Sequence, residues 1–132
     1  MRLVHLMTAA GVTLAAACGS STAPGGGTQN PNGISIQDFS FTPLMLTVKV
    51  GTTVTWTNNG PSGHTTTSDA GDPQAWSSGT LTPPSGGGGY GGGTPGGTYQ
   101  VTFMTAGTYT YHCALHPPSS YPTFTGKITV TP

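Results

Sequence analysis

The residues best suited to chemistry in this sequence are one cysteine and two histidines. Cys113 and His116 are three positions apart near the end of the chain, and His64 lies in an earlier loop that contains glycine and proline, Asn58 to His64. A cysteine and a histidine spaced in this way at the end of a strand can bind the same ion. Two imidazoles and a thiolate in a trigonal arrangement are the ligands of electron-transfer copper sites. We therefore predict that His64, Cys113 and His116 share one metal ion.

Each of these residues has a simpler explanation when it is taken alone. A lone cysteine is more often a small buried hydrophobe than a ligand, and a lone loop histidine is usually solvated. Their joint occurrence favours a metal site, because all three ligand types suit copper. The two other histidines are not expected to be ligands, since His5 lies in the N-terminal leader and His112 is expected to point to solvent.

Short strands are expected to position these residues. Apolar and polar residues alternate with a period of two, and glycine, proline and asparagine separate the runs, at 34–36, 46–50, 54–57, 99–103, 109–113 and 128–130. This pattern is typical of an antiparallel β-sandwich or barrel, and no segment has the length and period of a helix. In the run 109–113 the alternation puts Tyr109, Tyr111 and Cys113 on the core face.

Several other residues are interpreted as structural. Trp56 and Trp76 are expected in the core or at its edge, and Met45 and Met104 are interpreted as packing residues rather than copper-handling groups. Asp69 and Asp72 flank Gly71 and read as turn residues.

A glycine-rich segment interrupts the strand pattern. Residues 83–97 contain one aromatic residue, Tyr90, and little that could be buried in a packed strand. We expect a mobile loop inserted between strands. The alternative is a recognition loop built around Tyr90, because long inserted loops are sometimes binding elements.

The N-terminus has the pattern of an export signal. Residues 1–17 begin with one positive charge and continue as an apolar run, too short for a membrane-spanning helix of about 20 residues. The sequence from Leu14 to Cys18 resembles a bacterial lipobox, so Cys18 is the predicted lipid-bearing residue; ordinary cleavage that leaves Cys18 unmodified is the alternative. Residues 18–33 read as the anchor cysteine and a flexible linker, and 34–132 as one folded domain.

Composition restricts the function further. Only three lysines and arginines and three aspartates occur in 132 residues, so the chain has no basic patch for nucleic acid and no acidic run. If Cys18 carries lipid or is removed, Cys113 has no internal disulfide partner. An exported lone thiol is exposed to oxidation, and a bound metal would protect it.

Taken together, these motifs resemble the plastocyanin-like cupredoxins. The resemblance covers roughly residues 34–131 and rests on five pieces in order: Phe41-Thr42-Pro43, the stretch from Val48 to Asn58, His64, the stretch from Gly107 to His116, and Gly126-Lys127-Ile128-Thr129-Val130. It implies a Greek-key sandwich, one type 1 copper ion per chain and one-electron transfer. It also implies a solvent-edged His116, around which Leu115 and Pro117 would form a small apolar docking patch.

The sequence departs from this family at one position. Where the family usually supplies an axial methionine, this chain has Phe124, and no methionine follows Met104. One hypothesis is that Phe124 caps a three-coordinate copper, which predicts a high reduction potential because losing a donor destabilises Cu(II) more than Cu(I). The other is that Tyr121 or a backbone carbonyl approaches the axial position.

The predicted function is that of a monomeric electron carrier rather than an enzyme. We expect it to act outside the cytoplasm, in the periplasm or at the cell surface, held to the membrane through Cys18 and meeting a redox protein partner only transiently. One alternative is a copper storage or delivery lipoprotein. The other is a cupredoxin-like domain that has lost metal binding.

Overall fold

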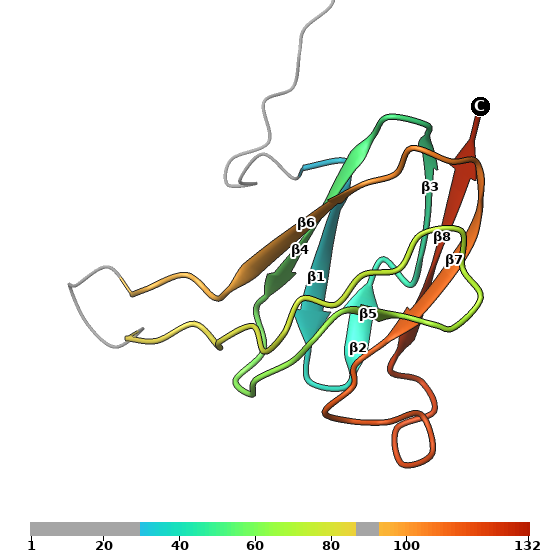
Figure 1. The fold of residues 1–132 in the computed structure, drawn as a ribbon. Coiled ribbons are helices and arrows are strands. Elements are labelled where there is room, and N and C mark those ends of the chain that lie inside the picture. Colours follow the sequence, from blue (N-terminus) through green and yellow to red (C-terminus); the bar gives the residue numbers. More distant parts are fainter. Residues whose placement is uncertain (1–29, 87–92) are drawn as a thin grey trace, which may run out of the picture.

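The computed structural model describes residues 30–86 and 93–132, which form two four-stranded sheets packed face to face (Figure 1). The predicted leader 1–17, Cys18 and most of the predicted linker lie outside the described residues, as does Tyr90. Within the described ranges, no helical segment has the length and apolar character that crossing a membrane requires.

Eight strands make up the two sheets. The first sheet has the order β2-β1-β4-β6 and the second has the order β3-β8-β7-β5. Their bounds are β1 Gly33–Gln37, β2 Ser40–Thr42, β3 Met45–Lys49, β4 Thr53–Asn58, β5 Thr67–Ser68, β6 Thr98–Thr102, β7 Gly107–His112 and β8 Thr125–Thr131.

The all-β prediction is confirmed, and each of the six predicted runs corresponds to a strand. Two short strands, β2 and β5, were not predicted. The sheets are mixed rather than purely antiparallel, because β1 runs parallel to β4 and β3 runs parallel to β8. The chain passes from the first sheet to the second between β2 and β3 and returns before β4. Such crossovers allow parallel neighbours, and the arrangement agrees with a Greek-key sandwich.

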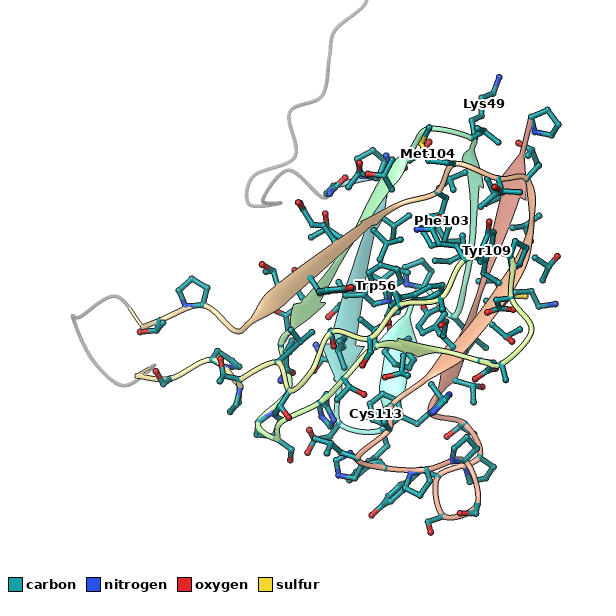
Figure 2. All side chains as sticks on the ribbon, in the orientation of Figure 1. Lys49, Trp56, Phe103, Met104, Tyr109 and Cys113 are labelled. Carbon is teal, nitrogen blue, oxygen red and sulfur yellow. The ribbon has the colours of Figure 1, made fainter. Side chains whose placement is uncertain are left out.

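The core lies between the sheets and is mostly aromatic and β-branched. Figure 2 shows Trp56, Phe103 and Tyr109 in this layer, with Cys113 at one end of the sandwich and Lys49 and Met104 at the other. The buried hydrophobic residues are Ile34, Ile36, Phe41, Val48, Val54, Trp56, Trp76, Leu81, Val101, Phe103, Tyr109, Tyr111, Cys113, Phe124, Ile128 and Val130. The prediction for the two tryptophans and for the inward face of the run 109–113 is therefore confirmed.

The expectation that the two methionines are packing residues is wrong. Met45 and Met104 are each 67% exposed. Met45 begins β3 on the strand's outer face, two residues before Thr47, where the period-two alternation points the side chain outward. Met104 follows the buried Phe103 in the connection after β6 and also faces outward.

The described parts of the glycine-rich segment are paired with each other and with the sheet. Ser85 and Thr94 form an antiparallel bridge, and the N–H of Asn58, the last residue of β4, donates to the Gly97 carbonyl at 2.9 Å. A Cβ on Gly96 would lie 1.7 Å from the Asn58 carbonyl oxygen, so only glycine permits this approach to β4. Some of these glycines therefore allow close backbone packing, a role that the glycine-rich composition alone does not reveal.

Candidate metal centre

Cys113 is fixed by the end of strand β7. The last residue of that strand, His112, pairs with Thr125 of β8, and Cys113 follows it as a buried free thiol. The Thr65 N–H donates to Cys113 Sγ at 3.3 Å, and the Ala114 N–H donates to Thr65 Oγ1 at 2.8 Å. The sulfur therefore lies in a pocket whose walls are joined by hydrogen bonds, with one backbone N–H directed at it.

His64 is held by the loop that follows β4. The buried Asn58 side chain organises this loop by donating to the carbonyls of Ser62 (2.8 Å) and Leu81 (2.9 Å) and by accepting from the Gly60 N–H (3.0 Å). His64 itself exchanges two backbone hydrogen bonds with Leu81. Hydrogen bonds thus fix both the backbone of His64 itself and the loop that precedes it.

His116 lies on the connection between β7 and β8 and is partly exposed. Its N–H donates to the Cys113 carbonyl at 3.3 Å, which closes a tight turn between the two predicted ligands. The following segment is ordered by two bonds to the Pro117 carbonyl, from the N–H groups of Ser120 and Tyr121 at 2.9 and 3.0 Å.

The three side chains converge at one end of the sandwich. Cys113 Sγ lies 3.9 Å from His64 Nδ1 and 3.6 Å from His116 Nδ1, and the three atoms all lie within 4.8 Å of one another. With metal–nitrogen and metal–sulfur bonds of about 2.0 and 2.3 Å, a trigonal site places nitrogen and sulfur about 3.7 Å apart. The donor types and their spacing therefore fit a single copper ion.

Aromatic rings surround the two imidazoles. The buried Phe124 ring has its centroid 5.0 Å from that of His64 and 6.0 Å from that of His116. Tyr121 meets His116 edge-on at 5.2 Å and stacks on Phe39 at 4.4 Å. Phe124 thus contacts both histidines of the cluster, whereas the Tyr121 ring packs beside only one of them.

Two acidic residues contact histidines, and neither contact was predicted from the sequence. Asp38 Oδ1 lies 2.9 Å from His64 Nε2, and this hydrogen bond holds the pKa of the Asp38 carboxyl below its ordinary value. No sequence signal links these residues, because they are 26 positions apart and Asp38 lies in a hairpin turn. Outside the cluster, Asp69 Oδ1 lies 2.6 Å from His112 Nδ1. The expectation of a solvated His112 was therefore incomplete, since its side chain is only 25% exposed.

A two-sheet sandwich with one cysteine and two histidines at one end defines a cupredoxin-type copper protein. The family model described as "Copper binding proteins, plastocyanin/azurin family" matches residues 28–131, and the chain belongs to this family. Copper is accordingly its cofactor.

Solved structures of cupredoxins are similar to this chain. A purple cupredoxin from Nitrosopumilus maritimus is 26% identical with a TM-score of 0.54, and the match covers 75% of this chain and 98% of that one. An oxidised methionine-to-leucine mutant of amicyanin is 30% identical with a TM-score of 0.55, covering 75% of this chain and 80% of its own. A Cu(I) form of a methionine-to-alanine mutant of amicyanin is 29% identical with a TM-score of 0.54, with the same coverage. A search of curated proteins found no match.

Proposed function

We propose that this protein is a type 1 copper protein that carries single electrons between redox partners, with His64, Cys113 and His116 as its copper ligands. The observation that carries the proposal is the convergence of Cys113 Sγ with the Nδ1 atoms of both histidines. Copper, when bound, supplies a one-electron couple between Cu(II) and Cu(I). The amicyanin structures include both an oxidised form and Cu(I) forms, which supports the use of this couple.

The surroundings of the cluster suit electron transfer because they restrict movement. The Cys113 thiol and the His64 imidazole are buried, and backbone hydrogen bonds fix the segments that bear them. A site that keeps its geometry in both oxidation states has little to reorganise when an electron arrives or leaves. The chain's contribution is thus to hold the donors, exclude water on the Phe124 side and leave the His116 edge accessible.

The exposed edge of the site suits brief docking. Leu115, next to His116, is 50% exposed, and Pro117 is exposed as well. We propose that this small apolar patch contacts a redox protein transiently, because such encounters bury little area and dissociate quickly. Within residues 30–86 and 93–132, Asp38 is the acidic side chain that hydrogen-bonds to the cluster, and His64 engages it. We propose a carrier rather than an enzyme, and a monomer.

The proposed location rests on the sequence alone. Residues 1–17 are proposed as a signal peptide and Cys18 as the lipid-bearing residue, which would place the domain outside the cytoplasm on a membrane anchor. Fractionation of cells that produce wild type and Cys18→Ala tests this. Release of the variant from the membrane fraction supports the anchor, and equal partition of both proteins argues against it.

Voltammetry of the copper-loaded protein tests the carrier function. We expect a reversible one-electron couple that survives repeated cycles with no copper transferred to a chelator present throughout. A storage or delivery protein would instead release copper to the chelator on reduction. Loss of copper within a few cycles, or the lack of a reversible couple, would contradict the carrier proposal.

A further inference from the structure

The turn between β1 and β2 contacts both histidines of the copper site. Gln37 pairs with Ser40, so the turn consists of Asp38 and Phe39, and it lies at the same end of the sandwich as the loop between β7 and β8 (Figure 1). Asp38 hydrogen-bonds to His64, and the Phe39 ring meets His116 edge-on with centroids 5.2 Å apart. Asp38 thus bonds to one imidazole, and the Phe39 ring lies closer to the other, since its centroid is 6.4 Å from that of His64.

Asp38 is placed to fix the proton of His64. A neutral imidazole carries one N–H, and the ring nitrogen bonded to a carboxylate is the one that keeps it. Because Asp38 lies 2.9 Å from Nε2, the proton is held there, and the lone pair of Nδ1 is directed toward the metal position beside Cys113 Sγ.

The Asp38 carboxylate is itself held in place. Its oxygens accept from the Ser62 N–H at 3.3 Å and the Ser62 hydroxyl at 3.0 Å, and its side chain is 31% exposed. A Cβ on Gly60 would lie 2.8 Å from Asp38 Oδ1, so the absence of a side chain at Gly60 makes room for the carboxylate. The loop that bears His64 therefore also fixes the position of the Asp38 side chain.

Phe39 has a conformation that its residue type disfavours. Its φ is 65°, in the left-handed region where glycine or asparagine would be expected in a tight turn. The ring is 37% exposed, stacks on Tyr121 and lies against His116. A strained residue retained beside a site suggests a role at that site. Here the left-handed backbone of Phe39 accompanies a ring that lies against the partly exposed His116 imidazole.

We propose that Asp38 and Phe39 are positioning residues that hold the His64 and His116 imidazoles in their ligand geometry before copper binds. The inference rests on the ligand set proposed above, but not on the electron-carrier role. The turn would preform the site, so that copper binding does not have to order the two rings.

Nitrogen-15 NMR of the histidines in the metal-free protein tests the role of Asp38, at a pH well above the ordinary histidine pKa of about 6.5. We expect a single Nε2–H tautomer for His64 in wild type and a mixture in Asp38→Ala. Asp38→Asn keeps a carbonyl acceptor and should restore the single tautomer. Gly60→Ala keeps the carboxylate but places a methyl group 2.8 Å from it and 3.0 Å from the Asp38 backbone nitrogen, so the whole turn must shift. If Asp38→Ala does not fold, Gly60→Ala should give the same mixture of tautomers.

Phe39→Gly and Phe39→Tyr form the matched pair for the second residue. The glycine variant relieves the backbone strain but removes the ring, so its melting temperature should fall little or rise while the His116 ring becomes mobile in NMR relaxation. The tyrosine variant should behave as wild type. Copper affinity, measured by competition with a chromophoric Cu(I) chelator, should fall about 10–100-fold in Asp38→Ala and should fall in Phe39→Gly also.

The inference fails if His64 keeps one tautomer in both Asp38→Ala and Gly60→Ala, or if His116 is as rigid in Phe39→Gly as in wild type. It also fails if affinity and melting temperature drop in parallel in Phe39→Gly, since that would indicate a merely structural role. These readouts come from the metal-free protein and from copper binding. A failed voltammetry experiment would therefore leave them unaffected.

Discussion

Replacing Phe124 with methionine tests whether this residue occupies the axial position of the copper site. Phe124 is buried, packs on Phe41 with centroids 4.8 Å apart and lies against both imidazoles. A methionine there would present a thioether to the metal. Because an added donor stabilises Cu(II) more than Cu(I), the reduction potential should fall, by about 59 mV for each tenfold gain in the preference for Cu(II).

Phe124→Leu is the matched control, because it changes the shape of the side chain without adding a donor. Both substitutions remove the ring but keep an apolar side chain, so each should destabilise the metal-free protein by about 1–2 kcal/mol, less than truncation to alanine would. We expect voltammetry to give a lower potential for Phe124→Met than for Phe124→Leu, with the leucine variant close to wild type. Equal potentials in the two variants, or a higher one in Phe124→Met, would show that Phe124 is not at the axial position.

Three further predictions concern the core and the docking edge. Gly126→Ala should lower the free energy of unfolding by about 1–3 kcal/mol in urea titration, because its Cβ would lie 2.2 Å from the Tyr111 ring; an unchanged midpoint would contradict this packing. Burial raises the pKa of Tyr111 above the unfolded value of about 10, so the unfolded state loses its proton first and stability should fall by about 1.4 kcal/mol per pH unit above pH 10. Tyr111→Phe should reduce the slope by that amount and leave the contribution of Tyr109, whose pKa is also raised by burial. An equal slope in both proteins would show that Tyr111 does not cause it. Leu115→Glu should slow electron exchange with a redox protein while the visible spectrum stays the same. Val50→Glu, next to Lys49 at the opposite end of the sandwich (Figure 2), should leave the exchange rate unchanged. An equal exchange rate in Leu115→Glu and wild type would show that the Leu115 patch is not the docking surface.

The main strands and the cysteine could be predicted because their signals are local. Alternation along Tyr109, Tyr111 and Cys113 depends only on the period of a strand, and the structure buries all three. The same reasoning failed for β2 and β5, which have three and two residues and are too short to show a period. The parallel pairs were missed since they depend on where the chain crosses between sheets.

The contacts around the predicted ligands could not be predicted from the sequence. Asp38 and Phe39 reach the site only because the β1–β2 turn and the loop bearing His64 lie at the same end of the sandwich. Their residue types do not indicate these contacts, because an aspartate in a tight turn is common. The left-handed conformation of Phe39 likewise becomes visible only in the folded chain.

Copper titration of the wild-type protein and of Cys113→Ser, followed by visible absorption, tests the shared copper site most directly. We expect an intense thiolate-to-Cu(II) band that saturates at one copper per wild-type chain and does not form in the serine variant. A colourless oxidised protein, or a band of equal intensity in Cys113→Ser, would contradict the assignment of His64, Cys113 and His116 to one type 1 copper ion.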